Sequence, residues 1–350
     1  MLKCGIVGLP NVGKSTLFNA LLKKQVALAQ NYPFTTIEPN VGVVEVPDVR
    51  LEKLKKVIEK SEGLAPDFKI IPAVVEFVDI AGLVKGAHKG EGLGNKFLSH
   101  IREVDAIVFA VRDFLNEDII RVGSETPKED LEILKDELLL KDLETVEKVL
   151  SSKDQRPVNE KELLAKIKIL IEQGKWFVDE LSTDDIDKIS DLQLLSAKKI
   201  IVVINSDESD LSKPSEIEGA IRISAKLEEE LAALSADEQK DYMRELGIKE
   251  SGLSKLAKKA YEVLGLLTFL TAGSKEVRAW TTKKGNLAPA AAGVIHSDFE
   301  RGFIAADTVD FEKFVEVGGW KEIRAKGLVR TIGKSEVMPE GVVVEFKFSL

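Results

Sequence analysis

The sequence predicts an α/β protein with a mostly parallel sheet, an inserted pair of helices and a smaller C-terminal α+β domain. Three observations support this prediction. Short apolar segments alternate with amphipathic ones over the first third of the chain, which is typical of a parallel sheet covered on both faces. A segment rich in leucine, glutamate and lysine follows from residue 128, with helical spacing and no strand-like run. Beyond residue 266, short strand-like segments and glycines return.

The first part of the chain reads as alternating strands and helices. Apolar runs of four to nine residues predict strands, and apolar residues at three-four spacing predict helices. The expected elements are a strand at 4–7, a helix at 16–23, a strand at 41–46, a short helix at 51–60, and strands at 70–78 and 105–111.

The charged middle segment predicts two antiparallel helices joined as a hairpin. Leucines and other apolar residues recur at helical spacing on both sides of a polar break at 151–159, which contains Pro157. The repeating residues are Leu139, Leu143, Val146 and Leu150 before the break, and Leu164, Ile167 and Ile171 after it. Such a hairpin is either a solvated structural arm or an arm that docks a partner.

The sequence after the hairpin predicts two more strands of the first sheet and then a separate C-terminal domain. Strands are expected at 199–204 and 220–223, followed by helical sequence through residue 264. The last domain is expected to contain strands at 269–272, 277–282 and 342–348 and an alanine-rich segment at 288–295. The domain boundaries expected from these changes are 1–127 and 191–265 for the α/β domain, 128–190 for the hairpin and 266–350 for the last domain.

Composition excludes several classes of protein. The 350 residues are 44% hydrophobic and 31% charged, which is ordinary for a soluble globular chain. A net charge of −9 argues against broad, nonspecific wrapping of nucleic acid, so no DNA partner is expected, but it leaves room for a local basic surface. The single cysteine, Cys4, lies in the first strand, so neither disulfides nor a zinc site are expected. The longest apolar run, 70–84, is interrupted by Glu76 and Asp79 and is too short to span a membrane, so we expect a cytoplasmic protein.

A phosphate-binding motif follows the first strand. The run Gly8-Leu9-Pro10-Asn11-Val12-Gly13-Lys14-Ser15 matches G-x-x-x-x-G-K-[ST] between a predicted strand and a predicted helix. Backbone N–H groups of such a loop and the helix N-terminus face a polyphosphate. Lys14 is expected to reach the β- and γ-phosphates and Ser15 to ligate Mg²⁺. The sequence therefore predicts binding of a nucleoside triphosphate.

Two further segments suggest that the γ-phosphate is sensed. Asp79 ends a predicted strand and can hold Mg²⁺, and Gly82 can bring its N–H against the γ-phosphate because it lacks a side chain. Thr36, or less favourably Thr35, can close over the metal from a proline-flanked loop. We therefore predict a switch-type hydrolase with Lys14, Thr36 and Gly82 in catalytic roles and Ser15, Thr36 and Asp79 around the metal.

The base is expected to contact a loop that departs from the GTPase motif. In N-K-x-D the Asp accepts hydrogen bonds from guanine and the Lys stem covers the ring. Here the run is Asn205-Ser206-Asp207-Glu208, so the Lys is replaced and the acid is one methylene longer. A carboxylate could still accept from guanine, and the residues alone leave ATP and GTP open.

Taken together, the motifs resemble those of the Obg-related translation-factor NTPases, and within them the Obg-like ATPases of the YchF family. The match covers essentially the whole chain. The motifs that carry it are residues 8–15, Tyr32-Pro33-Phe34-Thr35-Thr36, Asp79-Ile80-Ala81-Gly82-Leu83, Gly90-Glu91-Gly92-Leu93-Gly94-Asn95, residues 205–208, Val277-Arg278-Ala279-Trp280-Thr281 and His296-Ser297-Asp298-Phe299-Glu300-Arg301-Gly302-Phe303.

The resemblance implies a P-loop G domain with a helical insertion and a C-terminal ubiquitin-like TGS domain. It also implies preference for ATP over GTP, association with the ribosome and its RNA, and a K⁺ ion held near Asn11. Phe114 would pack beside adenine, and the last base-side loop would be 224–226. The implied nucleotide-binding residues are Asn11, Val12, Gly13, Lys14, Ser15, Thr16, Phe114, Asn205, Ser206, Glu208, Ser224, Ala225 and Lys226.

Two positions suggest slow intrinsic hydrolysis. Leu83 stands where Ras-like GTPases carry a water-orienting glutamine, and Phe109 stands where many relatives have a histidine. Leu83 cannot accept a hydrogen bond, so water must be positioned by backbone, an ion, a loop group such as His88 or a partner. The rival functions are a GTP-preferring GTPase, a small-molecule kinase and a nucleotide-stabilised scaffold or stress regulator with negligible turnover.

Overall fold

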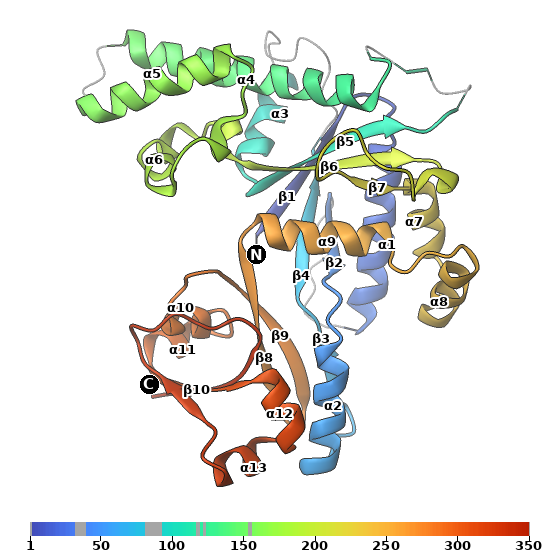
Figure 1. Ribbon diagram of the computed structural model, residues 1–350, viewed down its shortest axis with the longest axis vertical. Helices are drawn as coiled ribbons and strands as arrows, with labels where there is room; N and C mark the ends of the chain where they lie inside the picture. Colours follow the sequence, from blue (N-terminus) through green and yellow to red (C-terminus); the bar gives the residue numbers. More distant parts are fainter. Residues whose placement is uncertain are drawn as a thin grey trace. The chain divides into compact units, whose positions relative to one another are not determined.

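The computed structural model describes residues 2–31, 40–80, 93–116, 120–121, 124–152 and 156–349 (Figure 1). The chain divides into two compact units, each made of two separate stretches of sequence. The first comprises residues 1–44 and 75–263, and the second comprises residues 45–74 and 264–350. Among the described residues, no helix is both long and apolar enough to cross a membrane.

The first unit is built on a six-stranded sheet of order β2-β4-β1-β5-β6-β7. β1 pairs in parallel with β4 and β5, and the parallel pairing continues through β6 to β7. The strands are β1 (Lys3–Gly8), β2 (Val41–Glu45), β4 (Val74–Asp79), β5 (Ala106–Asp113), β6 (Lys199–Ser206) and β7 (Ile221–Ile223). Because β1, β4, β5, β6 and β7 are parallel, their carboxyl ends meet at one edge, where ligands of open α/β sheets bind.

Continuous apolar sequence explains why the central strands are buried. In β5, the residues from Ala106 to Val111 are all at most 1% exposed, as expected for a strand covered on both faces. Cys4 in β1 is also fully buried, and burial raises the pKa of its thiol to about 12.

The main helices of this unit outside the hairpin are α1 (Lys14–Asn31), α3 (Leu93–Arg102), α7 (Ala225–Leu231), α8 (Ala236–Glu245) and α9 (Gly252–Val263).

The predicted hairpin consists of α4 (Pro127–Ser151) and α5 (Val158–Glu172), and it belongs to the first unit. Pro127 begins α4 and the Thr126 side chain caps it, which is the usual chemistry of a helix start. Buried Asp142 anchors α4 to the chain that follows the hairpin, because its carboxylate accepts the N–H groups of Leu195 and Ser196 at 2.8 and 2.7 Å. Burial raises the pKa of this carboxyl to about 6.

The second unit is an α+β domain with a sheet of order β11-β10-β12-β8-β9-β3. One face packs against α10 (Ala288–Gly293) and α11 (Ser297–Arg301) around buried Phe269 and Phe303. Helices α2 (Arg50–Ser61), α12 (Phe311–Val317) and α13 (Trp320–Ala325) complete the unit. The strands are β3 (Lys69–Ile71), β8 (Leu266–Ala272), β9 (Glu276–Lys283), β10 (Phe303–Asp310), β11 (Arg330–Ile332) and β12 (Val342–Phe348).

The single strand expected at 70–78 is wrong, because this run forms two strands in two sheets. β3 pairs in parallel with β9 of the second unit, whereas β4 pairs with β1 of the first. Pro72 lies between them. It has no N–H to donate to a ladder and restricts the residue before it, so a continuous strand is interrupted there.

Residues 45–74 therefore fold with the last domain, although the sequence places them within 1–127. β3 extends the sheet beyond β9 with the register Lys69↔Glu276 and Ile71↔Arg278. Helix α2 lies against β8, β9 and α12 and buries Leu51, Leu54, Val57 and Ile58. A chain beginning at residue 266 would leave this part of the domain uncovered.

Truncation of Leu54 to alanine is expected to destabilise the second unit. Leu54 is fully buried in α2, and a leucine-to-alanine change in a core costs about 2–5 kcal/mol. Native-state hydrogen exchange should show faster exchange of amides in β8, β9 and β12, with β1 and β5 unchanged. Lys56→Ala, on the exposed side of the same helix, is the control. An equal loss of amide protection in β1 and β5 would contradict the assignment of α2 to the second unit.

Candidate nucleotide site

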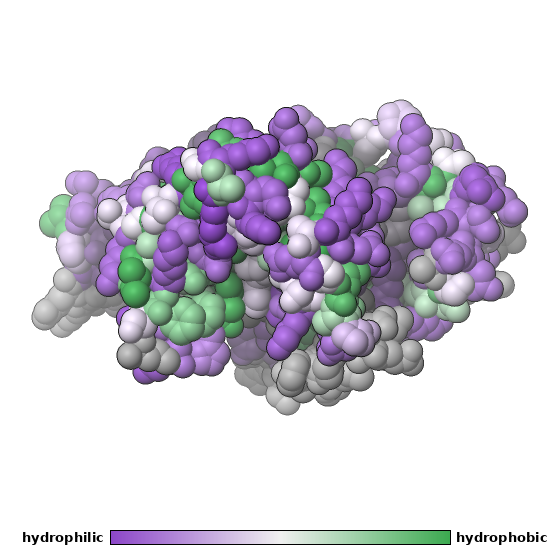
Figure 2. All heavy atoms as spheres, turned by 90° about the horizontal axis from the view of Figure 1, so that it is seen from below, coloured by the Kyte–Doolittle hydropathy of each residue, from purple (hydrophilic) through white to green (hydrophobic). Residues whose placement is uncertain are grey.

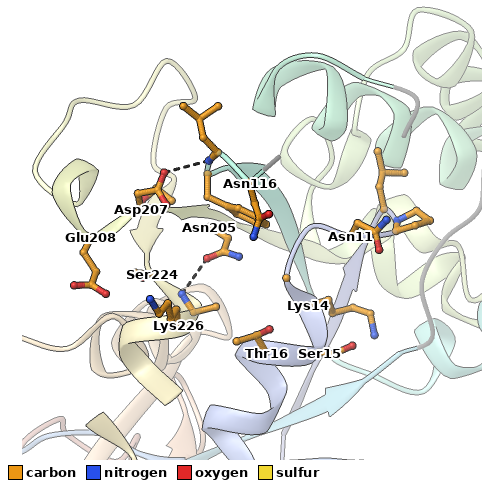
Figure 3. Close-up of a pocket in the computed structure, with 17 residues that line it drawn as sticks. Asn11, Lys14, Ser15, Thr16, Asn116, Asn205, Asp207, Glu208, Ser224 and Lys226 are labelled. Carbon is orange, nitrogen blue, oxygen red and sulfur yellow. Dashed lines mark hydrogen bonds between the residues drawn. The ribbon is translucent and has the colours of Figure 1, made fainter. Parts of the chain in front are cut away.

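A cavity of about 810 Å³ lies at the carboxyl edge of the first unit's sheet. It is lined by residues from four loops that are distant in the sequence: those after β1, β5, β6 and β7. Figure 3 shows Lys14, Ser15 and Asn11 toward one end and Asp207 and Glu208 toward the other. The lining residues are Leu9, Pro10, Asn11, Gly13, Lys14, Ser15, Thr16, Phe114, Leu115, Asn116, Asn205, Ser206, Asp207, Glu208, Ser224, Ala225 and Lys226.

The phosphate loop requires its glycines for two different reasons. Gly13 has φ +84°, and a Cβ there would lie 2.1 Å from the side-chain nitrogen of Asn205. At Gly8 a Cβ would lie 2.8 Å from the carbonyl oxygen of Ala110. Asn11 adopts φ 66°, which asparagine tolerates better than most residues. The loop therefore turns tightly and lies close to β5 and β6, with α1 beginning directly after it.

Lys14 and Asp79 form an ion pair at the phosphate end. The Lys14 side chain is 11% exposed and the Asp79 side chain 24%. Phosphate oxygens compete with the carboxylate for the ammonium of Lys14, and a divalent cation competes with the ammonium for Asp79. When a metal–triphosphate complex binds, phosphate oxygens can replace Asp79 as the partner of Lys14, and the metal can replace Lys14 as the partner of Asp79. Each side chain then keeps a partner of opposite charge.

Asn205 joins three of the four loops. Its side-chain amide donates to the carbonyl of Val12 at 2.9 Å, and its amide oxygen accepts the N–H of Ala225 at 2.9 Å. The residue is 7% exposed, so both hydrogen bonds are shielded from water. Asn205 thus fixes the phosphate loop and the start of α7 to the end of β6.

The loop after β5 carries Phe114 to the base end of the cavity. The guanidinium of Arg112 lies over the Phe114 ring, 4.3 Å from its centroid. It also donates to the carbonyl of Phe114 at 3.2 Å and to that of Asn116 at 3.3 Å. Buried Arg112 therefore orders the backbone that presents Phe114. The Asn11 amide, which donates to the carbonyl of Ile120 at 3.1 Å, links the same connection to the phosphate loop.

Most residues predicted from the sequence to bind nucleotide lie around this cavity. Val12 does not line it, because its side chain is buried and its carbonyl accepts from Asn205. The Ser224 hydroxyl caps α7 by accepting from Leu227 N–H, and the Ala225 N–H donates to Asn205. Lys226 is exposed at the same loop.

Several predicted positions lie outside the described residues: Thr35, Thr36, Gly82, Leu83 and His88. Phe109 is described, and it is a core residue. Its ring packs edge to face on Trp176 at 5.9 Å, and it does not line the cavity.

The donor set at the phosphate end suits a hard cation. Ser15 supplies a hydroxyl and Asp79 a carboxylate, which are oxygen ligands of the kind that Mg²⁺ prefers together with phosphate oxygens and water. No cluster of three or more His, Cys, Asp or Glu side chains able to hold a metal occurs among the described residues. Ser15 and Asp79 therefore fit a site in which Mg²⁺ would also take oxygen ligands from the triphosphate and from water.

Five residues that line the cavity are not among those predicted to bind nucleotide: Leu9, Pro10, Leu115, Asn116 and Asp207. Leu9 and Pro10 lie inside the phosphate-binding run 8–15, and Asp207 lies inside the run 205–208, so these three have a sequence signal. The Asp207 carboxylate accepts the N–H of Leu115 at 3.1 Å and so joins the loops after β5 and β6 (Figure 3). Leu115 and Asn116 reach the cavity because they follow β5 directly.

Replacement of Asn205 by alanine is expected to weaken both the fold and nucleotide binding. The change leaves the Val12 carbonyl and the Ala225 N–H buried without their partner, at a cost of about 1–3 kcal/mol for each group. Urea unfolding and ATP titration calorimetry measure the two effects. Asn159→Ala, at an exposed asparagine of the hairpin, is the matched control. If Asn205→Ala behaved like the control, the bridging role would be incorrect.

Comparisons with known proteins match the whole chain. Residues 3–206 match the family described as 50S ribosome-binding GTPase, and residues 266–349 match the YchF GTPase C-terminal family, described as a protein of unknown function. Proteins named ribosome-binding ATPase YchF are 46% identical in Bacillus subtilis, with 100% of both chains covered, and 41% identical in Escherichia coli O157:H7, with 99% of both covered. The solved structure of the Schizosaccharomyces pombe YchF GTPase has a TM-score of 0.79 and 36% identity, covering 99% of this chain and 97% of that one. The predicted fold class is thereby confirmed, and the chain belongs to the YchF family of P-loop proteins.

Proposed function

We propose that this protein is a Mg²⁺-dependent, ATP-preferring hydrolase that acts as a nucleotide switch and associates with the ribosome. One observation carries the proposal: a single cavity joins a complete phosphate loop to an aromatic residue and to Glu208 in place of the guanine-reading Asp. The names of the bacterial relatives, which describe ribosome-binding ATPases, support the same activity and partner.

In this proposal the chain's own groups bind and orient the triphosphate. The backbone N–H groups of the phosphate loop and the N-terminus of α1 hold the phosphate oxygens, and Lys14 leaves Asp79 to contact the β- and γ-phosphates. Ser15 and Asp79, with Thr36, would hold Mg²⁺, which neutralises phosphate charge when bound. Asn11 would help to hold K⁺ through its amide oxygen, since its amide nitrogen donates to Ile120.

The absence of a water-orienting glutamine supports slow intrinsic turnover. Leu83 cannot accept a proton or a hydrogen bond from water. Phe109 is enclosed in the core and supplies no polar group to the cavity. We infer that a loop group near Thr36 or Gly82, a cation or the ribosome positions the attacking water.

Replacement of Lys14 by alanine tests the proposed chemistry. Loss of the ammonium removes charge-assisted hydrogen bonds to the phosphates, so we expect ATP hydrolysis to fall about 100-fold or more. The wild type should bind ATP more tightly than GTP and hydrolyse it faster in K⁺ than in Na⁺. Calorimetry and phosphate release measure these properties, with Lys24→Ala on the same helix as the control.

The rival functions give different results in the same experiments. Tighter binding of GTP would identify a GTPase. Transfer of phosphate to a metabolite would identify a kinase. Tight ATP binding without hydrolysis, even with K⁺ and ribosomes, would identify a nucleotide-stabilised scaffold. Absence of binding to either purine triphosphate would overturn the proposal.

Ribosome association would depend on polar contacts. On the face drawn in Figure 2 hydrophilic residues predominate, and hydrophobic residues are interspersed among them. Among the described basic residues of the last domain, five pair with carboxylates: Lys284, Arg301, Arg324, Arg330 and Lys347. Among the described residues, Lys283, Lys326 and Lys334 have no carboxylate within ion-pair distance. These three lysines are among the groups available to contact RNA phosphates.

Charge reversal of Lys283, Lys326 and Lys334 to glutamate is expected to reduce co-sedimentation with ribosomes, most clearly at low salt where phosphate contacts are strongest. The control reverses the paired lysines Lys213, Lys240 and Lys259 of the first unit, which changes the net charge equally. Equal loss in both variants would indicate a net-charge effect only. Point variants are preferred to deletion of 265–350, because deletion would uncover α2 and β3.

A further inference from the structure

The base end of the cavity lacks the long side chain that covers the ring in the N-K-x-D motif. Ser206 occupies the lysine position, is 3% exposed and is too short to extend over a base. Its hydroxyl is buried and has no hydrogen-bond partner among the described residues. The end of β6 therefore provides no aliphatic cover for a bound purine.

A different side chain is available at the same end. Leu115 lines the cavity from the loop after β5 and is 91% exposed. A single exposed leucine is common on protein surfaces. This one differs because its backbone is held: its N–H donates to the Asp207 carboxylate at 3.1 Å (Figure 3).

The backbone on either side of Leu115 is held as well. Arg112 donates to the carbonyls of Phe114 and Asn116, the two residues that flank Leu115. The Arg112 guanidinium also lies over the Phe114 ring. An apolar side chain that is free to contact a ligand, on a backbone ordered before the ligand arrives, is the arrangement expected of a binding residue. Because this backbone is already ordered, less conformational entropy is lost when the ligand binds.

We propose that Leu115 covers one face of the purine base in place of the missing lysine stem, and that Asp207 is the positioning residue that holds it there. This inference rests on the proposed nucleotide site and adds to it the contact that binds the base. The interaction is apolar burial against an aromatic heterocycle, so it acts on the base and leaves the phosphates untouched.

The test compares ATP with inorganic triphosphate, which has no base. Leu115→Ala in the full chain is expected to weaken ATP binding about tenfold, whereas triphosphate should bind as it does to the wild type. Leu115→Met keeps an apolar side chain of similar size and should retain ATP affinity. Leu246→Ala, at an exposed leucine after α8, is the matched control. Titration calorimetry in the presence of Mg²⁺ measures the binding of ATP and of triphosphate to the wild type and to the three variants.

Asp207 is tested through its coupling to Leu115. Asp207→Ala should weaken ATP binding, and adding it to Leu115→Ala should cause little further loss, because the side chain that it positions is already absent. Asp207→Asn keeps an acceptor oxygen and should retain most of the affinity. Independent, additive losses would overturn the positioning role.

The other outcomes separate this inference from the proposed function. Wild-type affinity for ATP in Leu115→Ala would overturn the inference and leave the nucleotide site intact. An equal loss of ATP and triphosphate binding would also overturn it, because the change would then act on the phosphate loop. A wild type that bound neither compound would refute the proposed function itself.

Discussion

The Asn205 side chain is the constraint on which the candidate site depends. Its two hydrogen bonds join the phosphate loop, the end of β6 and the start of α7, and all three come from different parts of the chain. A Cβ at Gly13 would collide with this amide, so the Asn205 side chain can lie here only because residue 13 is glycine. A shorter or apolar side chain at 205 would leave two buried backbone groups unpaired.

A second polar network joins the base end of the site to the helical hairpin. Asp130, buried near the start of α4, accepts the backbone N–H of Arg112 at 2.9 Å and the guanidinium of Arg121 at 3.1 Å. Arg112 in turn orders Phe114 and the residues that follow it. The first turn of the hairpin and the base-side loop therefore share one hydrogen-bonded cluster, in which loss of any member leaves buried partners unsatisfied.

The chain passes twice between its two units before α3 begins. β2 and β4 are strands of the first sheet, and the segment between them supplies α2 and β3 to the second unit. The second unit is therefore not a contiguous C-terminal domain, and the matched C-terminal family region, 266–349, omits part of its core. Thr36 and Gly82, which lie outside the described residues, precede β2 and follow β4 in the sequence.

Local sequence determined the elements and the phosphate loop, because both depend on short-range rules. Apolar runs predicted β1, β5 and β6, three-four spacing predicted α4 and α5, and Gly8, Gly13 and Lys14 predicted the loop between β1 and α1. Only the tertiary structure decided which loops meet. It placed Leu115 and Asp207 at the base end, put Phe109 in the core, and divided 70–78 between two sheets. These outcomes depend on strand order and on hydrogen bonds between residues about a hundred positions apart, which no local pattern encodes.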